Sequence, residues 1–164
     1  MFVTLQVLTV LAVAIAMALA LAHALEFPGK MRLSKEQYLA VQPIYYPGFT
    51  FGGAAEPLGI VLVFILLLLT PADTAAFWLT AAALIALALM HAAYWLLTHP
   101  VNNFWLQGFQ LQGASARFFS LGASRRSGAE PAWIELRDRW EYSHILRAGL
   151  GLVSLVLLVA AIAI

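Results

Sequence analysis

The chain has 164 residues, of which 63% are hydrophobic and 10% are charged, and its formal net charge is +1. Soluble domains usually contain about 45–50% apolar and about 25% charged residues, so this composition excludes an ordinary soluble domain. The sequence has no basic stripe for binding nucleic acid. It also has no cysteine, which excludes disulfides, thiolate metal sites and cysteine nucleophiles.

Four apolar runs predict four transmembrane helices, at about residues 2–25, 51–70, 74–99 and 136–164. About 20 apolar residues span the hydrocarbon core of a bilayer. We expect the first helix to be retained rather than cleaved as a signal peptide, because no Lys or Arg precedes it and the run is too long. The predicted fold class is an all-α integral membrane four-helix bundle, with residues 1–164 forming a single transmembrane domain.

The second helix is expected to carry a glutamate into the membrane. The apolar run 58–70 alone would be roughly 20 Å long, which is too short to cross. Extension back to Phe51 gives enough length, and Pro57 is tolerated because it falls in the first turns of the helix. Glu56 then lies below the headgroups, where an ionised carboxylate needs a partner such as Arg147 or becomes protonated.

Two polar segments, residues 26–50 and 100–135, are predicted to be interfacial loops. Pro28 is expected to end the first helix and Pro100 the third. The sequence from Ser34 to Gln37 is typical of a capping box that opens a short helix in the first loop. That loop is interpreted either as an interfacial surface loop or as a lid over a site.

Four crossings place both long loops on one side of the membrane, together with all nine basic residues: Lys30, Arg32, Lys35, Arg117, Arg125, Arg126, Arg137, Arg139 and Arg147. The other side carries only Asp73 and the chain ends. The positive-inside rule therefore predicts cytoplasmic loops and places both termini on the outer side. We expect a multi-pass protein of the bacterial inner (cytoplasmic) membrane, with the lipid bilayer as its partner.

Ionisable side chains from all four helices are predicted to meet at the cytoplasmic end. Trp140, His144 and Arg147 share one face of the last helix, because they follow each other at i, i+4 and i+7. The other members of this polar layer are His23, Glu26, Glu56, His99 and Glu141. His91 is expected roughly 12 Å deeper than His99, outside the layer.

Several kinds of chemistry are compatible with this layer. Histidines and carboxylates could supply a metal site in a helix bundle, although the Glu-x-x-His pair of di-iron proteins is absent. His91 or His99 could ligate haem. A carboxylate–histidine pair could act as a general base. The simplest alternative is structural: Arg147 pairs with Glu56, and His23, His99 and His144 hold the bundle in register.

The layout of the chain resembles the anthrone-oxygenase-like family of small four-helix membrane proteins, many of which are known only as a domain of unknown function. The resemblance rests on the short first helix ending in polar residues, on Pro100-x-Asn102 and on Trp140-x-x-x-His144-x-x-Arg147. It implies a pocket near His144, and some family members are linked to oxidation of polycyclic anthrones to quinones without a known cofactor. By this resemblance His144 is a base, Arg147 stabilises an enolate-type anion, and Asn102 is a hydrogen-bond donor.

Two classes of function follow. The first is an oxygenase-like enzyme acting on an apolar aromatic or quinone-like substrate from the bilayer. The second is a non-catalytic accessory subunit or a hydrophobic small-molecule binder or carrier. For the enzyme, the expected catalytic residues are His144, Arg147, Glu56 and His23, and the expected substrate-binding residues are Asn102, Trp140, Glu26 and His99. No metal site is assigned, and the sequence leaves the cofactor, the oligomeric state and the protein partners open.

Overall fold

The computed structural model describes residues 2–105 and 133–164, and in these ranges the chain forms helices and no strand. The elements in chain order are α1 (Phe2–Lys30), α2 (Lys35–Val41), the 3₁₀-helix η1 (Gln42–Tyr45), α3 (Gly48–Gly52), α4 (Ala55–Leu68), α5 (Ala75–Ala93), the π-helix η2 (Tyr94–Thr98), α6 (His99–Trp105) and α8 (Trp133–Ala163). The larger part of the predicted second loop, residues 106–132, lies outside the described residues.

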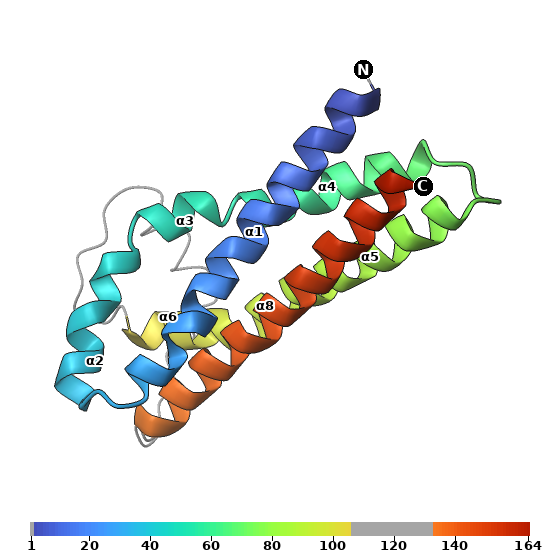
Figure 1. Cartoon of the computed structure of the whole chain (residues 1–164). Coiled ribbons are helices and arrows are strands. Elements are labelled where there is room, and N and C mark those ends of the chain that lie inside the picture. The colour runs from blue at the N-terminus through green and yellow to red at the C-terminus, as the bar shows by residue number, and fades with distance from the viewer. Residues whose placement is uncertain (1, 106–132) are drawn as a thin grey trace.

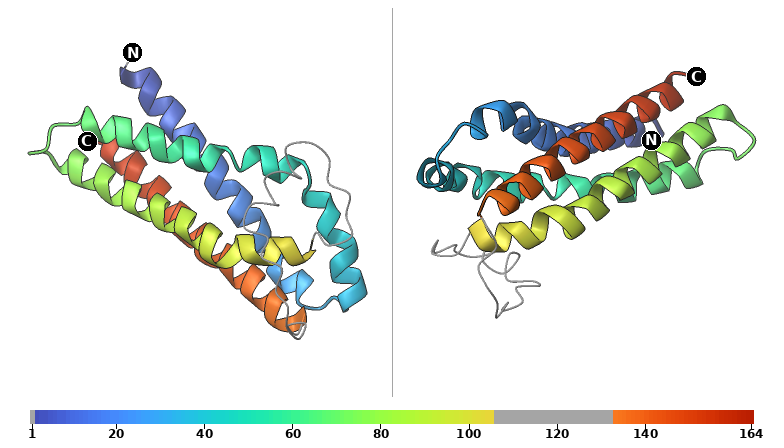
Figure 2. Two further views of the ribbon diagram at one scale, coloured as in Figure 1. Left: turned by 180° about the vertical axis from the view of Figure 1, so that it is seen from behind. Right: turned by 90° about the horizontal axis from the view of Figure 1, so that it is seen from below.

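Within the described ranges, four helical stretches are long and apolar enough to cross a membrane: Phe2–Lys30, Gly48–Leu68, Ala75–Asn102 and Trp133–Ala163. They run side by side along the molecule, and α8 packs against α1 and α5 while α4 completes the ring (Figures 1 and 2). Both termini lie toward the end that carries the α4–α5 turn (Figure 1). The short elements α2, η1 and α3 cover the opposite end, which we call the loop end.

Small residues let the crossings approach each other closely. The buried core includes Ala16 and Ala20 of α1, Ala83 of α5 and Ala148 of α8. In lipid, helix association depends on such close packing, because burial of apolar surface gives no driving force between helices that are already in an apolar solvent. The hydroxyl of Ser154 donates to the backbone carbonyl of Ala83 at 2.8 Å, which joins α8 to α5 without leaving a polar group unpaired.

The capping box predicted from the sequence is confirmed, and a second N-cap opens α5. Ser34 and Gln37 form the predicted capping box of α2, with both reciprocal hydrogen bonds present. Thr74 is the N-cap of α5, and its hydroxyl accepts a hydrogen bond from the Phe77 amide at 3.2 Å. These caps satisfy amides that the first turn of a helix leaves without a partner.

The predicted end of the first helix at Pro28 was wrong, because α1 continues through Pro28 to Lys30. A proline inside a helix removes one backbone hydrogen bond, and that loss must be offset by other contacts. Here the last turn is held by Lys30, whose ammonium contacts the Glu26 carboxylate at 2.8 Å and is almost completely buried.

The predicted end of the third helix at Pro100 was also wrong. The chain widens into the π-helix η2, in which the His99 amide bonds to the carbonyl of Tyr94, and then continues as α6. Proline is tolerated at the start of a helix, and Pro100 is the second residue of α6. Pro100 has no N–H to donate to a carbonyl of the preceding turn, and in this turn the guanidinium of Arg139 donates to the Leu96 carbonyl at 2.6 Å.

The second crossing has two parts, whereas the sequence predicted one helix over 51–70. Its first part, α3, begins at Gly48, and α4 follows from Ala55 to Leu68. As expected, Glu56 and Pro57 lie in the first turn of the longer part. The crossing begins before Phe51. Glu56 therefore lies deeper in the bundle than the polar layer that the sequence predicted at the loop end.

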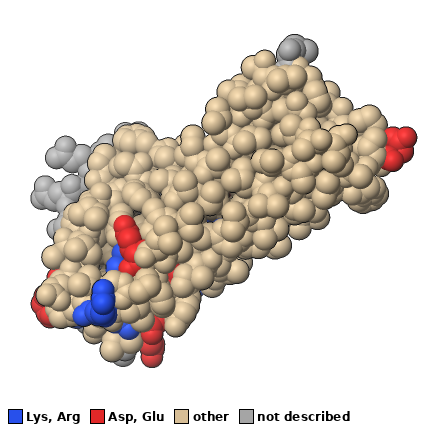
Figure 3. All heavy atoms as spheres, viewed as in Figure 1, with Lys and Arg blue, Asp and Glu red and all other residues tan. Residues whose placement is uncertain are grey.

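Charged side chains gather at the loop end, and the flank of the bundle is apolar on the face shown in Figure 3. The acidic group at the far end of that view corresponds to the turn between α4 and α5, where the sequence has Asp73. This distribution matches a helical bundle whose sides face lipid.

Gly151 marks the closest approach of α8 to its neighbours. A Cβ at this position would lie 3.1 Å from Met17 Cβ and 3.2 Å from Met17 Cα, which belongs to backbone and cannot easily move. We expect Gly151→Ala to lower the unfolding midpoint in mixed detergent–SDS titrations. Gly149→Ala is the matched control, because a Cβ there meets nothing within 4 Å and alanine favours a helix by up to about 1 kcal/mol. Equal midpoints for the two variants would contradict this packing.

Candidate functional site

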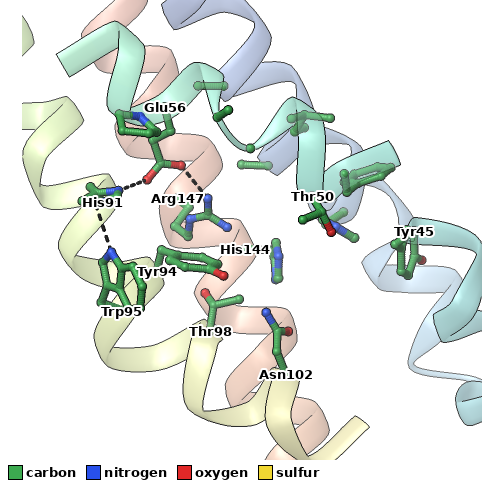
Figure 4. A pocket seen from close by; sticks show the side chains of 18 of the residues that line it. Tyr45, Thr50, Glu56, His91, Tyr94, Trp95, Thr98, Asn102, His144 and Arg147 are labelled. Carbon is green, nitrogen blue, oxygen red and sulfur yellow. Dashed lines mark hydrogen bonds and ion pairs between the residues drawn. The ribbon is translucent and has the colours of Figure 1, made fainter. Parts of the chain in front are cut away.

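A hydrogen-bonded network lies deep in the bundle and links α4, α5 and α8. The Arg147 guanidinium donates to Glu56 Oε2 at 2.6 Å, and His91 Nδ1 lies 3.0 Å from Glu56 Oε1. The indole of Trp95 donates to His91 Nε2 at 3.0 Å. Since an indole N–H can only donate, Nε2 of His91 is the acceptor and Nδ1–H donates to the carboxylate. Figure 4 shows this chain of contacts.

Glu56 lies in the first turn of α4, and each of its two carboxylate oxygens has a partner, Arg147 for Oε2 and His91 for Oε1. The Glu56–Arg147 pair was one of the expectations from sequence, and the structure confirms the contact. His91 was expected to lie outside the site, and that expectation was wrong because Glu56 sits deeper than predicted.

His144 presents an unprotonated ring nitrogen to the interior. Its Nδ1 lies 2.8 Å from the Trp140 carbonyl, and a carbonyl oxygen can only accept, so Nδ1 carries the proton. In the neutral ring Nε2 therefore has a lone pair, and no described residue donates a hydrogen bond to it. The Trp140 indole is fixed in turn by a 2.6 Å hydrogen bond to Asn102 Oδ1.

The ring of His23 in α1 contacts the ring of His144, with 4.2 Å between the ring centroids and 58° between the ring planes. The rings of Tyr45, Phe49 and Trp140 surround it at 4.5 to 4.8 Å. Its Nδ1 lies 3.3 Å from the Lys30 ammonium. An ammonium can only donate, so Nδ1 accepts and the proton of the neutral His23 ring is on Nε2. The two histidines therefore have opposite tautomers.

These side chains enclose a cavity of about 430 Å³, which we call the central cavity. A volume of this size falls in the range of small-molecule sites, which are mostly apolar with a few polar groups. Six of the eight predicted site residues line it: His23, Glu56, Asn102, Trp140, His144 and Arg147 (Figure 4). Glu26 and His99 do not. Glu26 faces Lys30, and His99 lies against the rings of Tyr94 and Trp95.

The segment from η1 to α3 forms a wall of the central cavity that sequence analysis did not assign to the site. It contributes Tyr45, Tyr46, Phe49, Thr50 and Gly53. The first loop was interpreted from the sequence either as an interfacial surface loop or as a lid over a site. The alternative interpretation as a lid requires such residues to line a site, as they do here.

The π-helix η2 places Tyr94, Trp95 and Thr98 on the cavity. A π-turn shifts the helical register, and such turns frequently occur at functional sites. Thr98 is held by a 2.8 Å hydrogen bond with Ser143 of α8. A signal for this wall was present in the sequence, because His91, Tyr94 and Thr98 follow each other at i, i+3 and i+7 and share one helix face. The sequence analysis used the spacing of His91, Trp95 and His99 instead.

A second polar cluster closes the loop end. The Tyr38 hydroxyl donates to Glu141 Oε1 at 2.8 Å, and the Tyr45 hydroxyl donates to Glu26 Oε2 at 2.7 Å. Burial, together with the adjacent carboxylates of Glu141 and Glu26, raises the pKa of both phenols well above the ordinary value. Both tyrosines therefore remain protonated donors, which fixes α2 and η1 to α8 and α1.

The described residues do not contain a group of three or more His, Asp or Glu side chains arranged to hold a metal ion. Of the two candidate haem ligands, His91 uses both ring nitrogens in hydrogen bonds. Its one basic lone pair, on Nε2, is directed to the indole of Trp95 and not to an iron atom. The donors that face the central cavity are better suited to an organic ligand with oxygen atoms.

Comparison of the chain with models of protein families, with curated proteins and with solved structures gives no match. The function must therefore be inferred from the chemistry and geometry of the central cavity.

The Glu56–Arg147 pair is expected to contribute strongly to stability. Glu56→Gln leaves the guanidinium of Arg147 without a countercharge, and loss of one partner of a buried ion pair costs about 3–5 kcal/mol. We expect a lower free energy of unfolding for Glu56→Gln, measured by SDS titration. The double variant with Arg147→Met should recover part of the loss, because no unpaired charge remains. Additive effects of the two substitutions would show that the residues are not coupled.

Proposed function

We propose that this chain is an integral membrane enzyme of the anthrone-oxygenase-like type, which takes a flat, apolar aromatic or quinone-like substrate from the bilayer. The observation that carries the proposal is the lone pair of His144 Nε2 in an apolar cavity beside the Arg147 guanidinium. His144 and Arg147 are three residues apart on α8, so they face the same side of the helix. A base and a cation are thus available to adjacent atoms of one ligand.

The proposed chemistry begins with removal of an acidic C–H proton from the substrate. The proton moves to His144 Nε2, and the electron pair of the broken bond delocalises onto the substrate's carbonyl oxygen. Molecular oxygen then adds to the carbanion, the peroxide takes up a proton, and loss of water leaves a second carbonyl. The overall change is CH₂ plus O₂ to C=O plus H₂O, and oxygen is the oxidant.

The electrostatics of the cavity favour the anionic intermediate. Preorganised donors in a site without bulk water stabilise developing charge much more than water does. Arg147 is a cation that lines the cavity, and Glu56 holds its guanidinium in position through the 2.6 Å contact. Two polar atoms of cavity-lining residues, Arg147 Nε and Thr50 Oγ1, are buried and have no hydrogen-bond partner among the described residues. Such groups are usually satisfied by water or a ligand.

We also propose that the loop end faces the cytoplasm and that both termini lie outside, in a bacterial inner membrane. The support is the sequence, in which all nine basic residues fall on the side of the two long loops. In this orientation the substrate reaches the cavity from the inner half of the bilayer.

A non-catalytic binder or carrier of apolar molecules, or an accessory subunit, is the second candidate. The pairing of Arg147 with Glu56 and of Lys30 with Glu26 favours it, because paired charges can serve stability alone. Under this alternative His144 would only form a hydrogen bond to the ligand. Binding would then be detectable and turnover would not.

Anthrone, which has one carbonyl and an acidic methylene, is a suitable probe for both candidates. In lipid nanodiscs, quenching of Trp95 and Trp140 fluorescence by anthraquinone measures binding to the cavity, and absorbance follows oxidation of anthrone above the protein-free rate. We expect His144→Gln to retain binding and to lower turnover by about 10²–10⁴-fold, as loss of a general base does. Gly149→Ala on the same helix is the control and should behave as wild type. Wild-type turnover by His144→Gln would remove this residue from the mechanism.

A further inference from the structure

Three polar side chains of α1 form a continuous chain from the surface to the central cavity. Glu26, His23 and Lys30 lie on one face of the helix, at spacings of three, four and seven residues. Glu26 Oε2 is 2.8 Å from Lys30 Nζ, and Lys30 Nζ is 3.3 Å from His23 Nδ1. The Glu26 side chain is 41% exposed, whereas that of Lys30 is 5% exposed. His23 lines the cavity. One end of this chain therefore meets water and the other meets the ligand site.

The groups around Lys30 leave few other routes by which a proton could reach its ammonium from water. The rings of Tyr45 and Trp140 each lie 4.8 Å from its ammonium. The only other carboxylate contact in the described structure is Glu141, at 3.7 Å, and this residue is fully buried and bonded to Tyr38. A proton that reaches Lys30 from water therefore passes by way of Glu26.

The hydrogen bonds also have a defined direction. Lys30 can only donate, so it donates to Nδ1 of His23, and the ring proton of neutral His23 is on Nε2. His23 can therefore accept a proton on one nitrogen while it gives one up from the other. This is the arrangement that a proton shuttle needs.

We propose that Glu26, Lys30 and His23 form a proton relay that delivers a proton from the loop end to an anionic oxygen of the ligand in the central cavity. This inference rests on the proposed function, since it is that reaction which forms an oxygen anion. It assigns positioning roles to Lys30 and Glu26, which do not touch the ligand, and a general-acid role to His23.

Each step of the relay balances in protons. The Nε2 proton of His23 moves to the ligand oxygen as a proton from Lys30 Nζ moves to His23 Nδ1. The neutral amine of Lys30 then takes a proton from water through the Glu26 carboxylate. When the ligand oxygen later loses its proton on forming a carbonyl, Lys30 first releases a proton to water through Glu26. The Nδ1 proton of His23 then moves to the Lys30 amine, His23 Nε2 takes up the proton of the ligand, and the relay is back in its starting state.

The coupling to Lys30 is what makes His23 a proton donor. Neutral imidazole is a very weak acid, so His23 alone could not protonate the ligand. Because His23 takes up a proton on Nδ1 as it gives one up from Nε2, the proton lost by the relay comes from the ammonium of Lys30.

Lys30→Arg tests the relay against a purely structural role. Arginine keeps the positive charge and the hydrogen bonds but does not release a proton in proteins. Lys30→Met removes both charge and proton. If Lys30 only supplies charge, Lys30→Arg should turn over anthrone as wild type does, and only Lys30→Met should fail. We expect both variants to lose turnover by about 10²-fold, the lower end of the range for general acid catalysis, with anthraquinone binding retained.

Tyr38→Phe is the matched control, because it breaks a hydrogen bond of the same buried cluster without interrupting the relay. It should keep wild-type turnover. In the wild type, turnover should also show a solvent deuterium isotope effect that disappears in Lys30→Arg, a change that a loosened fold would not produce.

Wild-type turnover by Lys30→Arg would overturn the relay and leave the proposed function intact. If Lys30→Arg does not bind anthraquinone, Glu26→Gln decides the question, because this substitution lies at the exposed end and keeps a hydrogen-bond acceptor for Tyr45. Reduced turnover with retained binding in Glu26→Gln supports the relay, and unchanged turnover overturns it. Absence of anthrone turnover by the wild-type protein removes both proposals.

Discussion

The ion pair between Glu56 and Arg147 is the constraint on which the rest of the structure depends. A carboxylate and a guanidinium within a membrane-spanning bundle are tolerated only if they meet each other, and they do so at 2.6 Å. The pair fixes the first turn of α4 against α8, and His91 and Trp95 extend it to α5. The central cavity lies beside this network. The polar side chains of the network keep α4, α5 and α8 from packing against each other as closely as purely apolar helices would.

A second set of polar contacts closes the cavity at the loop end. Tyr38 and Tyr45 donate to the carboxylates of Glu141 and Glu26, so the short elements between α1 and α4 are attached to the long helices through hydrogen bonds. Aromatic rings fill the space between these contacts, and Lys30 lies among them. The cavity is therefore bounded on one side by the Glu56–Arg147 ion pair and on the other by the aromatic rings of the loop end. His23 and His144 lie between these two sides.

The sequence predicted most of the site because helical spacing and membrane energetics restrict where polar residues can point. Glu56, His144 and Arg147 could be assigned to one cluster because each would otherwise face lipid. The segment from Tyr45 to Gly53 escaped prediction, since its short 3₁₀- and α-helical turns do not follow the regular periodicity from which the site was predicted. Tyr94 and Thr98 were not assigned either, although with His91 they follow the i, i+3 and i+7 spacing of one helix face.

By itself the sequence determined an all-helical protein with four stretches long and apolar enough to span a membrane, because in lipid a helix satisfies the backbone hydrogen bonds within one such run. It also determined which ionisable residues must find partners. Apart from the Glu56–Arg147 pair, only the tertiary structure decided which partners these residues have and that they enclose a cavity. That outcome depends on the relative depth and rotation of the helices, which are set by contacts between distant parts of the chain, such as that of Thr98 with Ser143.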